Sequence, residues 1–198
     1  MRSPWLLCSF LPLLSACAAA PLVPPYFETA PCPEAKPSLD GSAVITGFYE
    51  AFSRRDFRGM ACSYDPNIEF TDPVFGTLHG KRALAMWAML TSQGTDLRIQ
   101  ASQVRADGTA GHAHWDAYYS FPFLAFTNQV ENRIDASFEL RDGKIVRHQD
   151  SFDLQLWMKT ALWPLGGVIS EDTFRDTAKK KLDEFIAKYP QFQAAKPL

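Results

Sequence analysis

Apolar and polar residues alternate through much of the second half of the chain, with the period of two that is typical of β-strands. Three segments show this alternation at length: residues 96–105, 111–121 and 128–140. A fourth follows Asp142-Gly143, and an Asp-Gly step between two alternating segments is a strong hairpin signal. The pattern predicts four consecutive antiparallel strands.

A helical spacing of apolar residues precedes these strands. The first helix is predicted over residues 44–55 after Ser42 as N-cap, with an apolar stripe of Val44, Phe48, Ala51 and Phe52. A second short helix follows Asp56, a third covers residues 81–91, and between them residues 67–72 predict a short strand that Pro73 ends. We therefore expect an α+β fold in which a curved antiparallel sheet wraps over N-terminal helices, and such a cone encloses a pocket.

The strand after the Asp142-Gly143 turn is the first candidate for chemistry. Alternation places Val146, His148, Asp150 and Phe152 on one face of it. A histidine and a carboxylate two residues apart can exchange protons if their face lines the pocket. Asp150 is the preferred catalytic candidate, because apolar residues flank it on that face.

The strand at residues 111–121 offers two faces of different character. One face has the polar residues His112, His114, Asp116 and Tyr118, and the other has Ala113, Trp115, Ala117, Tyr119 and Phe121. An apolar face usually packs on the core. We nevertheless expect the polar face to point inward, because C-terminal helices are available to cover the apolar one. In that arrangement His114 and Asp116 would share a pocket with Asp150.

The N-terminus has the features of an export signal. Arg2 precedes an apolar run at residues 5–14 that is too short to span a bilayer, and small residues follow it. Leu14-Ser15-Ala16-Cys17 resembles a lipoprotein signal, in which Cys17 is lipidated. The alternative is ordinary cleavage nearby. We expect an exported protein, periplasmic or lipid-anchored to the envelope, with a signal at residues 1–17.

The remaining segments complete the predicted organisation. Six prolines between residues 18 and 40 indicate a semi-rigid linker. The cone domain then covers residues 41–154, and a helical extension covers 155–190 and packs on the sheet's outer face or serves as a lid or dimer contact. After export, Cys32 and Cys62 remain and could form a disulfide or stay as two thiols.

The overall composition excludes some partners. The net charge is −2, which gives no electrostatic basis for binding nucleic acid or an anionic membrane. We find no metal-ligand spacing and expect no cofactor. Membrane contact is expected only through a lipid anchor, and a homodimer is an open alternative.

Three stretches of the sequence, "FYEAF", "YDPNIEFTDPVFGTLHGKRAL" and "DGKIVRHQDSFDL", resemble the SnoaL-like branch of the nuclear-transport-factor-2-like superfamily. The resemblance covers residues 42–154 and implies the cone fold. The superfamily includes ketosteroid isomerase, polyketide cyclases and limonene-epoxide hydrolase, so a shared fold does not specify one reaction.

The resemblance also implies roles for individual residues. Asp72, in "EFTDPVFG", matches the general base of the isomerase, and Tyr49 lies where that enzyme has its oxyanion tyrosine. Asp135 matches its second oxyanion donor only by position, since alternation turns Asp135 away from the apolar face of its strand. The hydrolase resemblance places His114, Asp116 and Asp150 at the water-activating positions, with Phe70 and Asp72 where that family has water-positioning residues.

Two classes of function follow from the sequence. The first is an isomerase, cyclase or hydrolase that acts on a small apolar molecule by acid–base chemistry. Its catalytic candidates are Asp150, Asp116, His114, Asp72 and His148, and its candidate ligand-binding residues are Tyr49, Phe70, Trp87, Tyr118 and Phe138. The alternative is a non-catalytic ligand-binding or structural module of the envelope.

Overall fold

The computed structural model describes residue 32 and residues 40–92 and 96–193. The predicted signal, Cys17 and most of the proline-rich linker lie outside the described residues. Within them, no helix is both long and apolar enough to cross a membrane.

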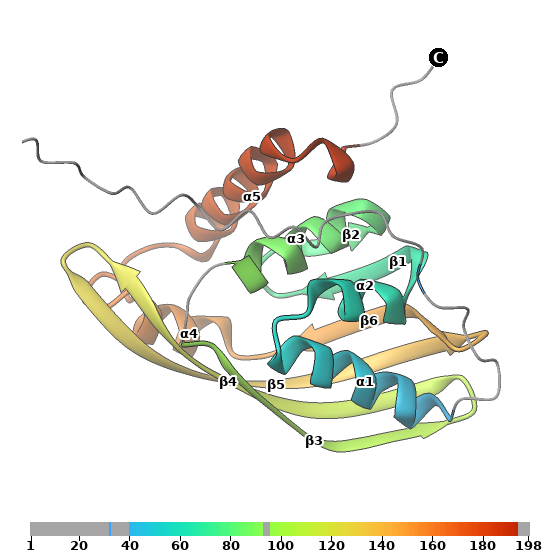
Figure 1. Cartoon of the computed structure of the whole chain (residues 1–198). Helices are drawn as coiled ribbons and strands as arrows, with labels where there is room; N and C mark the ends of the chain where they lie inside the picture. Colours follow the sequence, from blue (N-terminus) through green and yellow to red (C-terminus); the bar gives the residue numbers. More distant parts are fainter. Residues whose placement is uncertain (1–31, 33–39, 93–95, 194–198) are drawn as a thin grey trace, which may run out of the picture.

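Five α-helices and one six-stranded sheet make up the described part of the chain (Figure 1). The helices are α1 (Gly41–Ser53), α2 (Phe57–Ser63), α3 (Gly80–Ser92), α4 (Leu154–Ala161) and α5 (Glu171–Lys188). The strands are β1 (Tyr64–Asp72), β2 (Gly76–His79), β3 (Arg98–Asp107), β4 (Ala110–Phe123), β5 (Phe126–Arg141) and β6 (Lys144–Ser151).

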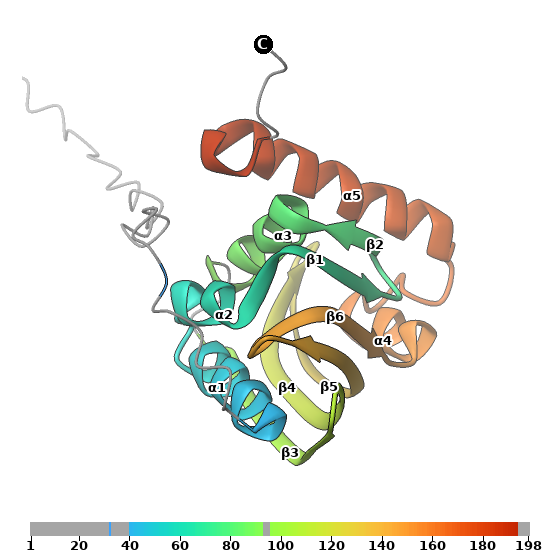
Figure 2. The same cartoon turned by 90° about the vertical axis from the view of Figure 1, so that its right-hand side faces the viewer.

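The sheet is mixed, and its strand order is β2-β1-β6-β5-β4-β3. β3 to β6 form the predicted antiparallel meander, while β1 pairs with β6 in parallel. β2 was not predicted: it pairs with β1 across a tight turn that ends at Gly76, whose φ of 69° suits glycine. The sheet curves around α1, α2 and α3 (Figure 2), which confirms the predicted α+β cone.

Local sequence signals explain where several elements begin. The side chains of Asp56, Asp153 and Ser170 accept hydrogen bonds from the first turns of α2, α4 and α5, as N-caps do. Asp142 and Gly143 both have positive φ values, which confirms the predicted hairpin turn. The cap of α1 is Asp40 rather than the predicted Ser42.

The register of β6 differs from simple alternation at one position. The pairing with β5 shifts between Glu139 and Leu140, so Leu140 lies opposite Ile145 and Glu139 lies opposite Arg147. This bulge buries Ile145 in place of Val146, and the prediction for Val146 was wrong. Beyond the bulge, His148 and Asp150 point into the core, as predicted.

The two C-terminal helices cover different parts of the cone. α5 packs on α3, on the side away from the sheet (Figures 1 and 2). α4 packs against the long β4–β5 hairpin, where Trp157 donates a 2.6 Å hydrogen bond to Tyr119 and stacks edge-on against Phe121. Both partners are on the core-facing side of β4, so the expected packing on the outer face of the sheet was wrong.

Cys32 and Cys62 form a disulfide that joins the segment before the cone to the end of α2. The two thiols that the sequence left open as an alternative are therefore not present.

Candidate functional site

His148 lies at the centre of the cone and has no exposed surface. Its Nε2 atom is 3.0 Å from Asp150 Oδ1, and its Nδ1 atom is 2.6 Å from the hydroxyl of Tyr64. Since an ionised carboxylate can only accept, we assign the proton to Nε2, which donates to Asp150. Nδ1 then accepts from Tyr64, and all three side chains form one continuous hydrogen-bonded chain.

Aromatic rings enclose the His148 imidazole. The ring centroids of Phe48, Phe70, Trp87 and Phe138 lie between 4.3 and 5.9 Å from that of His148. These residues come from two helices, α1 and α3, and two strands, β1 and β5, so both the helices and the sheet pack around the hydrogen-bonded chain.

Asp150 is 5% exposed and has one oxygen engaged and one available. Oδ1 accepts from His148 and also from the indole N–H of Trp115 at 3.1 Å. Oδ2 has no hydrogen-bond partner among the described residues, and it is not one of the fully enclosed polar atoms. Oδ2 is therefore the oxygen that is available to accept a proton or to bind a water molecule.

Asp72 supplies a second carboxyl group, and the charge of Asp150 affects its pKa. It ends β1, two residues beyond Phe70 on the same face, and its Oδ1 accepts the backbone N–H groups of Val74 and Phe75 at 3.0 and 2.6 Å. Burial raises the pKa of Asp72 from 3.8 to about 7; the hydrogen bond from Phe75 opposes this shift, and the negative charge of Asp150 adds to it. Asp72 therefore exchanges its proton near neutral pH. The carboxylate that influences it, Asp150, accepts hydrogen bonds from two donors.

Two buried donors in the same interior lack a hydrogen-bond partner among the described residues: the hydroxyl of Tyr49 and the indole nitrogen of Trp87. Burial, reinforced by the charge of Asp150, raises the pKa of Tyr49 well above its usual value, so its hydroxyl stays protonated. Burial, reinforced by the charge of Asp150, also raises the pKa of Tyr64 well above its usual value; the nearby Trp87 N–H opposes this shift without forming a well-aligned bond. Buried polar groups without partners are uncommon and call for an explanation.

The polar face of β4 points away from this interior, and the expectation that it points inward was wrong. Ala113, Trp115 and Ala117 are buried, and the alternation therefore turns His114, Asp116 and Tyr118 to the outer side of the sheet. The reason is the packing of Trp115 against the rings of Tyr49 and Phe52 on α1, at 6.0 and 5.5 Å.

His114 forms a surface cluster with carboxylates instead of contributing to the interior. Its Nδ1 is 2.8 Å from Asp135 on β5 and its Nε2 is 3.4 Å from Asp116. The hydrogen bond to Asp135 is the main reason that the pKa of His114 is raised. Asp135 is solvent-facing, as predicted, and its partner is His114; the neighbouring Arg133 binds Glu131.

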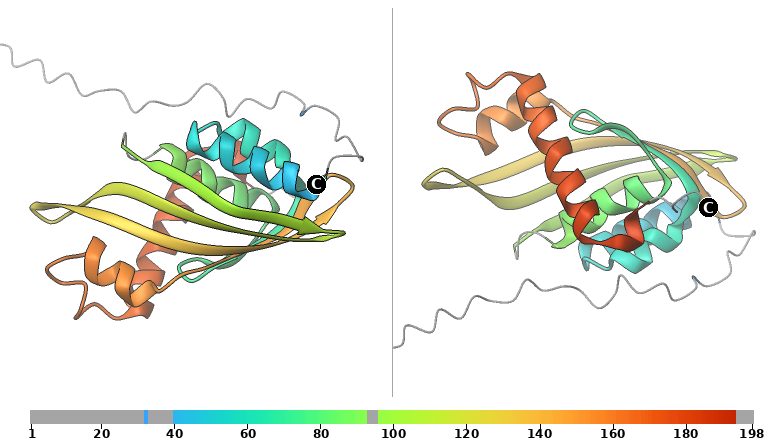
Figure 3. Two further views of the ribbon diagram at one scale, coloured as in Figure 1. Left: turned by 90° about the horizontal axis from the view of Figure 1, so that it is seen from below. Right: turned by 90° about the horizontal axis from the view of Figure 1, so that it is seen from above.

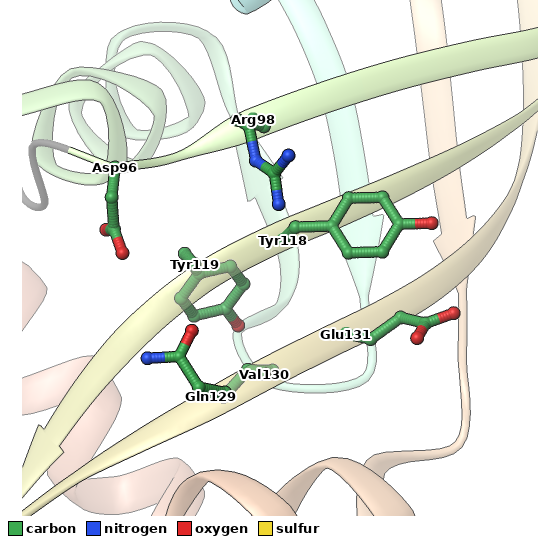
Figure 4. Close-up of a pocket in the computed structure, with 7 residues that line it drawn as sticks. All are labelled: Asp96, Arg98, Tyr118, Tyr119, Gln129, Val130 and Glu131. Carbon is green, nitrogen blue, oxygen red and sulfur yellow. The ribbon is translucent and has the colours of Figure 1, made fainter.

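Tyr118 lines an open hollow of about 390 Å³ together with residues of β3 and β5 (Figure 4). The guanidinium of Arg98 lies 5.5 Å from the centre of the Tyr118 ring. The residues that line the hollow are Asp96, Arg98, Tyr118, Tyr119, Gln129, Val130 and Glu131. None of the interior residues Asp150, His148 or Asp72 borders it, so Tyr118 does not belong to the interior site.

Of the residues proposed from the sequence, the structure brings together Asp72, Asp150 and His148 with Tyr49, Phe70, Trp87 and Phe138. Sequence reasoning missed two members of the site, Tyr64 and Trp115. Trp115 could have been found, because it lies between Ala113 and Ala117 on the apolar face of β4. The bond between Tyr64 and His148 joins residues 84 positions apart, and no local pattern indicates it.

Comparisons with known proteins agree with the fold. Residues 45–148 match the model of the SnoaL-like domain. No curated protein matches the sequence.

Many solved structures are similar to the chain, and three of them illustrate the similarity. TerC, co-crystallised with polyporic acid, has a TM-score of 0.52 and 19% identity over 64% of this chain and 98% of its own. A putative polyketide cyclase from Xanthomonas campestris pv. campestris has a TM-score of 0.52 and 21% identity over 61% of this chain and 96% of its own. An NTF2-like protein of unknown function from Burkholderia pseudomallei has a TM-score of 0.51 and 16% identity over 62% of this chain and 98% of its own.

At these identities the similar structures support the fold and not a reaction. The match to the family model covers more than half of the chain and ends at His148, before α4 and α5. The chain therefore belongs to the family of SnoaL-like domains and adds two C-terminal helices to the matched region.

Proposed function

We propose that the cone binds a small apolar molecule with at least one oxygen and acts on it by acid–base chemistry. Asp150 is the base or water activator in this proposal, and Asp72 is the group that gives or takes a proton near neutral pH. The observation that supports this most is the pair itself. Asp72 has a pKa of about 7 that the charge of Asp150 helps to raise, and Asp150 Oδ2 has no hydrogen-bond partner among the described residues. Titratable groups perturbed in this way are typical of functional sites.

The ligand class follows from the groups that line the interior. The rings of Phe48, Phe70 and Phe138 favour an apolar and preferably flat molecule. The free N–H and O–H donors of Trp87 and Tyr49 favour a carbonyl, phenolic or quinone oxygen on it. Polyporic acid, the compound co-crystallised with TerC, is a suitable first ligand to test.

A non-catalytic module, ligand-binding or structural, is the second candidate, and the dense packing around His148 favours a structural role for that residue. His148 is completely buried among aromatic rings, and Asp150 lines neither the hollow beside Tyr118 nor a second hollow beside Met158. In this alternative, the chain of Tyr64, His148 and Asp150 only stabilises the core.

Proton exchange on 2-tetralone, a small apolar ketone, separates the two candidates. The full chain is incubated with 2-tetralone in D2O, and deuterium incorporation next to the carbonyl is followed by NMR. We expect the chain to accelerate exchange and Asp150→Asn to reduce the acceleration by about 10²- to 10⁴-fold, the usual contribution of a general base. Asp116→Asn, which removes a carboxylate from the outer face of the sheet, is the matched control and should leave the rate unchanged.

Asparagine keeps the oxygen of Asp150 that accepts hydrogen bonds, so we expect the variant to fold and to bind. Circular dichroism checks the folding, and tryptophan quenching checks the ligand affinity. Unchanged exchange in Asp150→Asn would exclude the proposed base. Binding of 2-tetralone by the wild-type chain with no acceleration of exchange would favour the binding module.

A further inference from the structure

A side chain of the C-terminal helix α5 reaches the turn that holds Asp72. We call this the Asp72 turn and define it as residues 72–76, from the last residue of β1 to the first residue of β2. The Nε atom of Arg175 donates a 2.9 Å hydrogen bond to the backbone carbonyl of Pro73, 102 positions away in the sequence. Figures 2 and 3 show α5 running across α3, with its first turns beside the turn between β1 and β2. α5 lies beyond the matched residues 45–148, so the resemblance to SnoaL-like domains does not supply this contact.

The carbonyl that Arg175 binds belongs to a peptide group that also binds Asp72. The Pro73 C=O and the Val74 N–H are the two ends of one planar peptide unit. Arg175 donates to the oxygen of this unit, and the N–H of the unit donates to Asp72 Oδ1 at 3.0 Å. A hydrogen bond at one end of a peptide polarises it and strengthens the bond at the other end. Because the unit is planar, fixing its oxygen also fixes the direction in which its N–H points.

The guanidinium of Arg175 is itself held in place. Its Nη2 is 2.6 Å from Glu171 and its Nη1 is 3.5 Å from Asp172, which lie four and three residues earlier on α5. A planar guanidinium tied in this way directs its remaining donor along one line. The helix is anchored beside it, because the ring of Phe174 packs against Trp157 of α4 with centroids 5.1 Å apart. Ion pairs and packing together therefore hold the Arg175 donor at the Asp72 turn.

From this geometry we propose that Arg175 is a positioning residue of the Asp72 site. It holds the peptide between Pro73 and Val74 so that the backbone N–H groups of the turn stay directed at the Asp72 carboxyl. Arg175 acts through the turn and not on a ligand. The inference rests on the proposed function only where it concerns turnover, since the hold on Asp72 is a property of the chain without a ligand.

This role gives a direction for the titration of Asp72. Burial raises the pKa of Asp72, the N–H groups of residues 74–76 oppose that rise, and the charge of Asp150 adds to it. The N–H groups act by binding the ionised carboxylate. A looser turn weakens these bonds, so the pKa of Asp72 should rise further when Arg175 is replaced.

The elements β6, β2, α3 and α5 contact β1 or the Asp72 turn, and each carries ionisable groups. These are Asp150 and His148 on β6, His79 on β2, Lys81 and Arg82 on α3, and Glu171, Asp172 and Arg175 on α5. The cations of α3 have other partners, since Arg82 pairs with Asp183 and Lys81 donates to the backbone carbonyl of Gln193. Glu171 and Asp172 balance the charge of Arg175, so its hydrogen bond acts on the turn more than its charge does.

A carbon-13 titration of the Asp72 carboxyl in three variants of the full chain tests this role without a ligand. Arg175→Met removes the hydrogen bond and the charge, and Arg175→Lys keeps the charge but not the planar guanidinium. We expect both to raise the Asp72 midpoint by roughly 0.5 to 1 pH unit, the effect of weakening one hydrogen bond. Arg82→Met is the matched control: it breaks the 2.6 Å ion pair between α3 and Asp183 of α5 and should leave the midpoint unchanged.

Hydrogen exchange of the Val74 and Phe75 amides is a second readout, which a change of charge alone does not move. We expect these amides to exchange about 2- to 10-fold faster in Arg175→Met and Arg175→Lys than in the wild type. A wild-type midpoint and wild-type amide exchange in Arg175→Met would overturn the inference. Restoration of the wild-type midpoint in Arg175→Lys would also overturn it, because charge alone would then explain the effect. Circular dichroism checks that the variants fold.

The outcome for Arg175 is separate from the outcome for the proposed function. If the wild-type chain does not accelerate deuterium exchange on 2-tetralone, the proposed reaction fails, while the midpoint and the amide exchange still decide the role of Arg175. If the wild type is active, the pH dependence of its activity should move upward in Arg175→Met by the same amount as the Asp72 midpoint.

Discussion

His148→Ala should lower the free energy of unfolding by roughly 3–5 kcal/mol, the range measured when one partner of a buried ionic or hydrogen-bonded pair is removed. The substitution leaves the Tyr64 hydroxyl without its acceptor and Asp150 Oδ1 without one of its two donors. It also opens a cavity among the rings of Phe70 and Phe138, which are anchored in different strands and cannot collapse freely.

Urea unfolding followed by circular dichroism measures this loss. Arg147→Ala is the matched control, because Arg147 is the preceding residue on the opposite face of β6 and its ion pairs with Glu69 and Glu139 are at the surface. Exposed ion pairs contribute at most about 1 kcal/mol. A His148→Ala variant as stable as Arg147→Ala would show that the buried hydrogen-bonded chain does not stabilise the fold.

Asp72→Asn should remove a fall in stability that the wild-type chain shows as the pH rises from about 4 to 7. The pKa of Asp72 is raised from 3.8 to about 7 on folding, so the folded state binds the proton more tightly than the unfolded state. Stability is therefore greatest below the unfolded pKa and declines until the pH passes the folded pKa. After allowance for partial exposure of the side chain, the decline amounts to roughly 2–4 kcal/mol.

The asparagine keeps an oxygen that can accept from Val74 and Phe75 and cannot ionise, so only the titration is removed. We expect the variant to match the wild type at pH 3.5 and to exceed it at pH 8. Urea unfolding at pH 3.5, 5, 6, 7 and 8 gives both curves. Parallel curves over the whole range would mean that folding leaves the pKa of Asp72 at its ordinary value and would contradict this prediction.

The sequence predicts the strands and helices of the cone well because their signals are local. The alternation of β3, β4 and β5, the Asp142-Gly143 turn and the cap at Asp56 each depend on neighbouring residues. The same alternation placed His148 and Asp150 correctly, because the bulge at Val146 lies before them and not between them.

The interior of the site could not be predicted in the same way, because its geometry depends on contacts between distant elements. The apolar face of β4 lies inside and packs Trp115 against α1, as apolar faces usually do. The opposite expectation assumed that the C-terminal helices cover this face from outside, and the position of those helices depends on contacts that periodicity does not describe. β2 was missed since it is four residues long and pairs only at the edge of the sheet.

The raised pKa of Asp72 is equally a product of the folded cone. The same Asp-Pro step in an exposed turn would be an ordinary cap, and the difference comes from burial and from the charge of Asp150, 78 positions away in the chain. For this reason the sequence could nominate Asp72 only through resemblance.

The negative charge of Asp150 raises the pKa of Asp72 inside the cone, and a titration of the side-chain carboxyl of Asp72 by carbon-13 NMR tests this interaction most directly. The spectra are recorded between pH 4 and 9 for the wild-type chain and for Asp150→Asn. We predict a midpoint near 7 for Asp72 in the wild type, and a lower midpoint in Asp150→Asn because the neighbouring negative charge has been removed. A midpoint near 4 that is the same in both proteins would contradict the account.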